Sequence, residues 1–259
     1  AWDRLVELQF HPLSEIRTLA SALSDLGVKR YPTAFSGIAQ DVKRFEDYYQ
    51  KLGLEYFYYD IPYRDKVAWP EFETRNTYSK RNYYTNSGLN RPKGVAVPRY
   101  VSLLGDFEFK YALDFGSYRD IQRHRDCLQP MPLLTVDMGF ERWYIDQLPA
   151  PMREEADTLI HKQTAVLRDL LVAGVNRATL QYYIPMGFKV PCTLICDYRE
   201  LVYIAELRSS KTVHPTLRKI AHRMAAVAQS MNICNVYADL DEEDFSIRRG
   251  SQDIVEKRS

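Results

Sequence analysis

The densest group of side chains that could do chemistry lies between Asp114 and Arg125, directly behind an aromatic run. This segment reads Asp-Phe-Gly-Ser-Tyr-Arg-Asp-Ile-Gln-Arg-His-Arg and holds three arginines and one histidine. On a helix, Arg119, Gln122 and Arg123 would share one face, with Arg125 at its edge. Guanidinium groups in that arrangement match the oxygens of a phosphate. The alternative is a solvated basic helix face balanced by the nearby aspartates.

A second charged cluster lies far down the chain. It reads Asp-Tyr-Arg-Glu-Leu-Val-Tyr-Ile-Ala-Glu-Leu-Arg-Ser-Ser from Asp197, and His214 and Arg218 follow it. At helical spacing Arg199 and Tyr203 share one face, whereas Arg208 belongs to another. Because an arginine in the first turn of a helix opposes the helix dipole, we expect an anion or carboxylate near Arg199.

Together the two clusters resemble the flavin-dependent thymidylate synthases, and more closely the second half of the longer, tandem members of that family. The resemblance rests on the Arg-His-Arg segment, a long helix pattern and the later Glu-Leu-Arg-Ser run, and covers roughly residues 100–230. It implies an α+β fold with a central mixed or antiparallel sheet flanked by long helices. It also implies C5-methylation of a uracil nucleotide, with FAD as cofactor, methylenetetrahydrofolate and NADPH as co-substrates, and a homotetramer.

By position, the resemblance also assigns roles to single residues. Arg123, His124, Arg125 and Arg199 would bind the cofactor, and Arg208 would be the catalytic arginine that reaches the pyrimidine. We further expect substrate contacts from Arg119, Gln122, Tyr203, His214 and Arg218. Structural alternatives stay open: a His124 pair with Asp120, an Arg208 pair with Glu206, and a His214 that serves only at the start of a helix.

The chain departs from the family signature directly after Arg125. The family continues with Ser, Asn, Glu, Ser, Arg and Tyr, whereas the matching positions from Leu128 to Val136 are apolar, proline or hydroxyl residues. Such a loop lacks charge-assisted donors, and its prolines remove backbone N–H groups. The family's flavin-binding histidine is also replaced, by the run Val97-Pro-Arg-Tyr. We therefore expect either a substrate other than deoxyuridylate or a catalytically silent half that serves as a binding or oligomerisation module.

Composition limits the remaining classes. With 259 residues, 46% of them hydrophobic, the chain can build one large or two modest cores, and no apolar run is long enough to span a bilayer. Four cysteines without a Cys-x-x-Cys pair, and the lack of a leader pattern, favour a cytoplasmic protein with reduced thiols. The five histidines show no metal-ligand spacing. The first residue is Ala, which favours a start inside a longer chain, as expected if a homologous half is missing.

Residues 74–105 form a basic, tyrosine-rich stretch. They carry six basic residues, no acidic one and four interleaved tyrosines, although the net charge of the chain is only +1. One interpretation is a groove for single-stranded nucleic acid or an anionic small molecule, and the one we favour is a long surface excursion or oligomer contact. We expect one domain over residues 1–240, with this excursion inserted at about 61–100, and a polar tail at 241–259.

The elements that must position these motifs follow from hydrophobic periodicity and capping signals. We expect strands at 5–10, 55–60, 106–113 and 189–196, and helices from Ser14 to Gly27 and at 38–52, 119–127, 151–173, 176–183, 198–208 and 214–231. Asp197 is placed to cap the helix at 198–208. Both charged clusters would therefore follow a strand and lie on the helix behind it.

Overall fold

The computed structural model describes residues 2–11, 13–43, 46, 69–77, 90–130 and 133–241. Two compact units are present. The first contains Ala1–Ala68, Met131–Asp137 and Thr158–Pro185, and the second contains Trp69–Pro130, Met138–Asp157 and Met186–Ser259. The single domain expected over residues 1–240 stays a prediction, and the tail beyond residue 241 lies outside the described residues.

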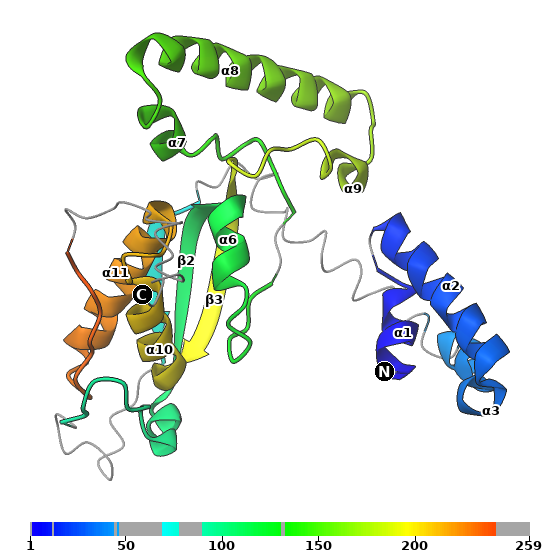
Figure 1. Ribbon diagram of the computed structural model, residues 1–259, viewed down its shortest axis with the longest axis horizontal. Helices are drawn as coiled ribbons and strands as arrows, with labels where there is room; N and C mark the ends of the chain where they lie inside the picture. Colours follow the sequence, from blue (N-terminus) through cyan, green and yellow to red (C-terminus); the bar gives the residue numbers. More distant parts are fainter. Residues whose placement is uncertain are drawn as a thin grey trace, which may run out of the picture. The chain divides into compact units, whose positions relative to one another are not determined.

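The second unit is built on a three-stranded antiparallel sheet (Figure 1). Its strands are β1 (Phe72–Asn76), β2 (Asp106–Asp114) and β3 (Lys189–Asp197), in the order β1-β2-β3. The register places Phe107 opposite Cys196 and Tyr111 opposite Cys192. The strands predicted at 106–113 and 189–196 are therefore confirmed, and the unit has the α+β character expected from the sequence.

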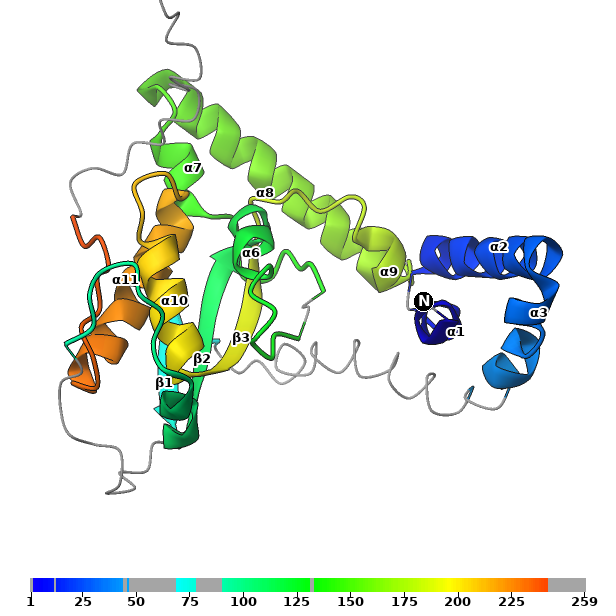
Figure 2. The same cartoon turned by 60° about the horizontal axis from the view of Figure 1, so that its bottom comes forward.

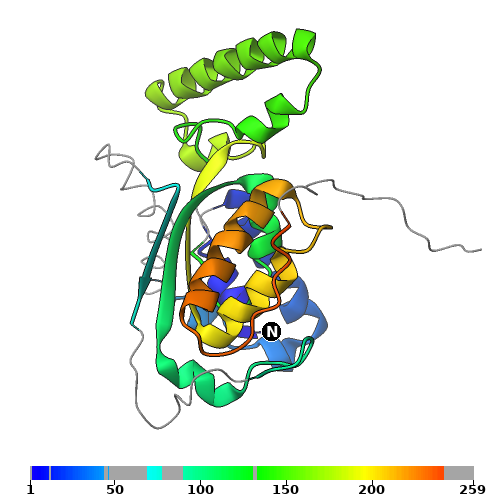
Figure 3. The same ribbon diagram turned by 90° about the vertical axis from the view of Figure 1, so that its left-hand side faces the viewer.

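Every second side chain along the two long strands is buried, and these side chains form the core. Phe107, Phe109, Tyr111 and Leu113 of β2 are buried, and their partners on β3 are the buried Cys196, Leu194, Cys192 and Val190. Residues opposite one another in a pleated sheet point to the same face. That face is covered by α6 (Phe115–Ile121), α10 (Tyr198–Arg208) and α11 (Pro215–Ser230), with α10 and α11 side by side (Figures 1 and 3).

Helix α10 begins where the sequence predicts. The side chain of Asp197 accepts a hydrogen bond from the backbone N–H of Glu200 at 2.8 Å, which satisfies one of the free donors of the first turn. A 3-10 helix, η1 (Arg99–Leu104), contacts α10, and the segment leading into η1 runs alongside it (Figure 2). Helix α10 is thus held between the sheet, α11 and the segment before η1.

The helix predicted at 119–127 is wrong in its bounds. Asp114 caps α6 through the backbone N–H of Ser117 at 2.9 Å, so the helix starts early, and it ends at Ile121. Beyond that point the side chain of Gln129 donates to the carbonyls of Ile121 and His124, at 3.2 and 3.0 Å. The Gln129 amide therefore satisfies carbonyls that the backbone N–H groups of a further helical turn would otherwise satisfy. The Arg-His-Arg run lies in a turn and not on a helix face.

The first unit corrects two further predictions. The strand expected at 5–10 is a helix, α1 (Trp2–Leu8), which packs against α2 (Ser14–Arg30). Helix α2 does not end at Gly27 but continues to Arg30. The glycine lies within the helix and allows the ring of Phe35 in α3 (Pro32–Phe35) to pack closely, since a Cβ there would lie 2.6 Å from that ring. Residues 38–43 are helical as expected, whereas the rest of that pattern, apart from residue 46, and the strand expected at 55–60 lie outside the described residues.

The remaining helices lie between β2 and β3 in sequence. They are α7 (Arg142–Asp146), which was not predicted, α8 (Ala150–Val172) and α9 (Arg177–Leu180). The long helix expected at 151–173 is confirmed, and the one at 176–183 is shorter than expected. In the described ranges, no helix combines the length and the apolar character that a bilayer crossing requires.

Candidate functional site

The two charged clusters of the sequence meet in the second unit. They line one pocket of about 360 Å³, formed by Arg123, His124, Arg125, Asp126, Glu200, Tyr203, Leu207 and Arg208, which we call the arginine pocket. Small-molecule sites commonly have volumes of this size. The turn after α6 supplies one wall and the exposed side of α10 the other. Five of the predicted site residues are therefore brought together by the fold.

His124 is the buried centre of this pocket, with 5% of its surface exposed. Its Nδ1 lies 2.9 Å from Oε1 of Glu200, and its Nε2 accepts a hydrogen bond from Nε of Arg208 at 3.0 Å. Because arginine can only donate, the imidazole proton must lie on Nδ1 and point to Glu200. Both ring nitrogens are thus used, and the partner is Glu200 and not the Asp120 carboxylate considered from the sequence.

Two hydrogen bonds within the protein orient the guanidinium of Arg208. Besides its bond to His124, its Nη2 donates to the backbone carbonyl of Asp120 at 2.5 Å. Burial lowers the pKa of Arg208, and the Asp120 carboxylate opposes that shift, so the group remains a cation. Its Nη1 has no hydrogen-bond partner among the described residues. The pair with Glu206 considered from the sequence is not formed.

The rim of the pocket is cationic and aromatic. Arg123 has 71% of its side chain exposed and lies 4.0 Å from Asp120, whereas Arg125 is exposed and makes no ion pair within the described chain. Tyr203 is 55% exposed, and its ring stands edge-on to His124 at 5.5 Å. Guanidinium forks beside an exposed aromatic ring suit an anion that carries a flat ring system.

A second pocket adjoins the first along α10. Its volume is about 580 Å³, and it shares Asp126, Glu200, Tyr203 and Leu207 with the arginine pocket. The far wall is the segment from Lys93 to Val97. Arg199 lines this pocket and donates from Nε to the carbonyl of Val97 at 3.0 Å, so its partner is a carbonyl and not the anion or carboxylate that we expected. Its two terminal nitrogens have no partner among the described residues.

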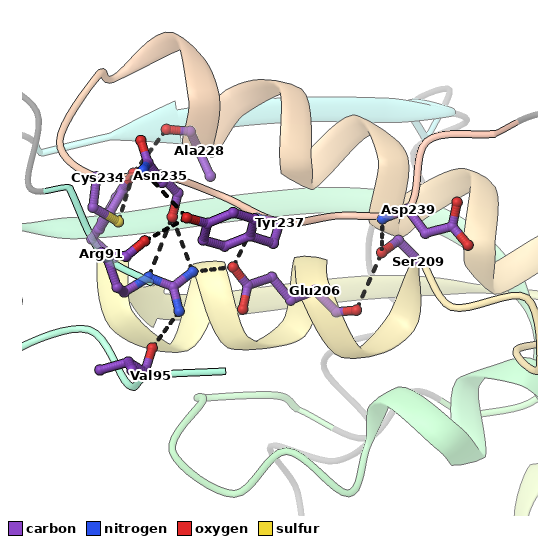
Figure 4. A network of polar contacts seen from close by, with 10 residues as sticks. Arg91, Val95, Glu206, Ser209, Ala228, Cys234, Asn235, Tyr237 and Asp239 are labelled. Carbon is purple, nitrogen blue, oxygen red and sulfur yellow. Dashed lines mark hydrogen bonds and ion pairs between the residues drawn. The ribbon is translucent and has the colours of Figure 1, made fainter. Parts of the chain in front are cut away.

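Arg91 holds that wall in place, which the sequence did not reveal (Figure 4). Only 6% of Arg91 is exposed, and its guanidinium pairs with Glu206 and donates to the carbonyl of Asn235 at 2.9 Å. Tyr237 closes the network, because its N–H donates to Glu206 at 2.9 Å and its hydroxyl to the carbonyl of Arg91 at 2.6 Å.

This network corrects the interpretation of Arg91 as part of an exposed basic stretch. Its partner Glu206 lies 115 positions further along the chain, so no local spacing could have predicted the pair. Residues 78–89 of the basic, tyrosine-rich stretch lie outside the described residues.

Four of the five predicted substrate residues lie outside both pockets, and two of these four are exposed at α6. Arg119 is exposed on α6, with Nη1 3.6 Å from the sulfur of Met186, and Gln122 is the exposed residue that follows the last turn of that helix. Neither side chain lines the arginine pocket or the pocket next to it. Their substrate roles stay predictions.

His214 belongs to a different polar cluster. Its Nδ1 lies 2.8 Å from the hydroxyl of Thr216 and 3.2 Å from that of Ser117, and its ring packs on Trp143 at 4.6 Å. Nearby, the hydroxyl of Tyr144 donates to Asp114 at 2.9 Å. Burial, with the Asp114 carboxylate, raises the pKa of Tyr144 well above its usual value. This cluster joins α6, α7 and the start of α11.

Arg218 is fully buried, and its guanidinium makes hydrogen bonds within the protein. Its Nε donates to the carbonyl of Ser209 at 2.6 Å and its Nη2 to that of Asp241 at 2.9 Å, with the Asp239 carboxylate at 3.5 Å. These contacts fasten the end of α10 to the C-terminal segment. The substrate role predicted for Arg218 stays a prediction.

The loop that departs from the family signature is held by neutral contacts. Leu128 is exposed and pairs with Ile195 of β3. In the first unit, the backbone N–H of Leu134 donates to Oε1 of Gln181 at 2.6 Å, and Nε2 of Gln181 donates back to the carbonyl of Leu134 at 3.2 Å. An amide side chain thus fixes this stretch of the loop where the family has charged nucleotide contacts.

Fold and pocket together define an α+β protein with an arginine-lined pocket. No protein-family model matches the chain. It is similar to a UPF0159 protein of Chlamydia muridarum, 34% identical over 122 residues, which are 46% of this chain and 22% of that protein. A UPF0159 protein of Chlamydia pneumoniae is 30% identical over 116 residues, 45% of this chain and 21% of the relative.

A more distant relative is UPF0159 protein Ta1429 of Thermoplasma acidophilum, 26% identical over 152 residues, which are 58% of this chain and 30% of the relative. The chain therefore spans about a fifth to a third of the length of these curated relatives. The names of these relatives state no activity.

Proposed function

We propose that this chain is a divergent flavin-dependent C5-methyltransferase that acts on a uracil nucleotide, with methylenetetrahydrofolate and NADPH as co-substrates. One observation carries the proposal. Arg125, Arg208 and the exposed Tyr203 line the arginine pocket together, and Arg125 and the Nη1 group of Arg208 have no partner among the described residues. Cations without partners beside an aromatic ring are what a nucleotide needs from a protein.

The residues present fit FAD as cofactor. FAD has a pyrophosphate between two flat ring systems, and the two adjoining pockets offer Arg123, Arg125 and Arg199 for phosphates beside Tyr203 and Leu207 for a ring. When bound, FAD would supply the hydride chemistry that joins NADPH oxidation to methyl transfer. The phosphate contacts would be charge-assisted, and each is worth about 1.5–3 kcal/mol.

Within this site the chain would contribute positioning and charge stabilisation. Arg208 would donate from Nη1 to a pyrimidine oxygen, where negative charge develops as C5 becomes nucleophilic. His124 and the carbonyl of Asp120 hold the rest of its guanidinium, so the group needs little reorganisation during the reaction. Since the loop from Leu128 to Val136 lacks the family's charged contacts, the substrate would be a uracil nucleotide other than deoxyuridylate.

Turnover tests this proposal directly. FAD-loaded protein with methylenetetrahydrofolate and NADPH should release tritium from at least one C5-tritiated uracil nucleotide. Arg208→Gln should abolish the release, because the variant keeps a hydrogen-bonding side chain without the cation. Arg30→Gln is the matched control, since Arg30 is an exposed arginine outside both pockets. Absence of release from every uracil nucleotide would refute the methyltransferase assignment.

The second candidate is a catalytically silent half that serves in binding or oligomerisation. One observation favours it: α8 presents a stripe of exposed apolar side chains at helical spacing, which are Met152, Leu159, Val166 and Leu170. Apolar stripes of this kind are typical of association surfaces. This candidate predicts a homo-oligomer that Leu159→Glu with Val166→Glu dissociates in sedimentation velocity. It also predicts no thermal shift with FAD, so a shift would count against it.

A further inference from the structure

Two cysteines face each other across a short antiparallel pairing beside the arginine pocket. Leu128 and Ile195 exchange both of their backbone hydrogen bonds, at 2.8 and 2.9 Å. The next residues outward are Cys127 and Cys196. In antiparallel strands, the pair next to a hydrogen-bonded pair has its Cα atoms only about 4.5 Å apart, with the side chains on the same face. A disulfide bond tolerates that separation.

The two thiols are close enough to interact. Cys127 is the side chain that interacts most strongly with the Cys196 thiol. The contact with Cys127 and burial together raise the pKa of Cys196, which therefore remains a protonated thiol at neutral pH. Cys196 is buried, whereas Cys127 is half-buried, so a dissolved reagent reaches Cys127 first.

We propose that Cys127 and Cys196 are a redox modification site, at which a reversible disulfide fastens the arginine-bearing turn to the end of β3. Cys127 follows Arg125 by two positions, and Cys196 directly precedes Asp197, the residue that caps α10. The bond would therefore join the turn that forms one wall of the arginine pocket to the strand that leads into α10, the helix that forms the other wall. This inference stands on the cysteine geometry alone and does not depend on the proposed activity.

The oxidant would be a low-molecular-weight disulfide. The thiolate of Cys127 attacks one of its sulfurs, forms a mixed disulfide and releases one thiolate. Cys196 then loses its proton to solvent and attacks the Cys127 sulfur, which forms the protein disulfide and releases the second thiolate. Two electrons pass from the two cysteines to the reagent, which leaves as two thiols. Because Cys196 holds its proton strongly, the second step should be the slower one.

Oxidation should also stabilise the folded chain. The bond would close a loop of roughly 70 residues and so restrict the unfolded state. We expect a rise in melting temperature of about 5 °C or more, reversed by dithiothreitol.

The test uses the purified 259-residue chain incubated with oxidised glutathione. We expect an intact mass lower by two hydrogens, monomeric protein, and a cross-link between the tryptic peptides that contain Cys127 and Cys196. Cys192 falls in the same tryptic peptide as Cys196, so Cys192→Ala must keep the cross-link. Cys127→Ala must lose both the cross-link and the rise in melting temperature, and circular dichroism would verify its fold.

Other outcomes would overturn the inference. A cross-link that Cys192→Ala abolishes would place the bond elsewhere. A stable mixed disulfide on Cys127 without closure, a disulfide-linked dimer, or four thiols that remain unmodified in the wild type would each show that the pair does not act as a redox site. These wild-type readings do not depend on the folding of any variant.

Discussion

His124 determines how the arginine pocket is arranged, because one buried ring orients both an acid and a cation. Its Nδ1–H points to Glu200 and its Nε2 receives Arg208, at 2.9 and 3.0 Å. Because both ring nitrogens are used, the His124 ring positions Glu200 and Arg208. The resemblance to the flavin enzymes assigns His124 to the cofactor site, and that role stays a prediction.

The His124–Glu200 contact predicts strong coupling between the two residues. We expect His124→Ala and Glu200→Ala each to lower the free energy of unfolding by about 1–3 kcal/mol, since each leaves a buried polar partner unsatisfied. Their effects should be non-additive by at least about 0.5 kcal/mol in a double-mutant cycle followed by urea unfolding. Fully additive losses would show that the contact contributes nothing.

Much of this pocket could be predicted from residue types and spacing. Arg123, His124, Arg125, Tyr203 and Arg208 were expected to act together, and they line one pocket. Arg91 could not be predicted, because an arginine between proline and asparagine in a basic stretch looks like a surface residue. Its burial depends on an ion pair formed only when distant segments meet.

At the scale of elements, α10 supplies one wall of the arginine pocket, and Asp197 determines where this helix begins. Asp197 ends β3, and its carboxylate caps the first turn of α10. We expect Asp197→Ala to lower the free energy of unfolding by about 1 kcal/mol, whereas Asp197→Asn should cost only a few tenths, because asparagine also caps well. Equal losses for the two variants in urea unfolding would show that the negative charge matters and not the cap.

Elements with strong periodic patterns were predicted well, and those fixed by tertiary contacts were not. Strands β2 and β3 and helices α8 and α10 follow from alternation, helical spacing and one cap. The end of α6 depends on Gln129, a side chain from beyond the turn that takes up its last carbonyls. Gly27 looked like a helix terminator, but its neighbour Phe35 shows that the position requires a small residue inside a helix.

At the scale of the molecule, the Arg91 network joins the segment before η1, α10 and the C-terminal stretch of the second unit. We expect Arg91→Met to lower the free energy of unfolding by about 3 kcal/mol, because it leaves the largely buried Glu206 without its cation. Lys93→Met is the matched control, since Lys93 is exposed, and should change stability by less than about 0.5 kcal/mol. Similar effects for both variants in chemical denaturation would contradict the account.

The core also predicts sensitivity to alkaline pH. Burial raises the pKa values of Tyr111 and Cys192 above their ordinary values of 10.0 and 9.0, and that of Tyr144 is raised for the same reason. The unfolded chain therefore loses these protons first as the pH rises above about 9, and the folded state loses stability. Each such group contributes a slope of up to about 1.4 kcal/mol per pH unit.

Urea unfolding between pH 7 and 10.5 would measure this slope. Stability should be constant below about pH 8.5 and fall above it, and Tyr144→Phe should make the fall less steep because one titrating group is gone. A flat profile up to pH 10.5 would mean that these groups are not held in their protonated form by the fold.

The most direct test of the central claim is the visible absorbance of the purified chain after incubation with excess FAD and desalting. We expect retained flavin, with Arg125→Gln and Arg199→Gln each weakening FAD binding by about 10- to 100-fold, as expected for the loss of one charge-assisted contact. Arg119→Gln should retain flavin like the wild type. A colourless wild-type protein, or flavin held equally by all four, would contradict a cofactor site in the arginine pocket.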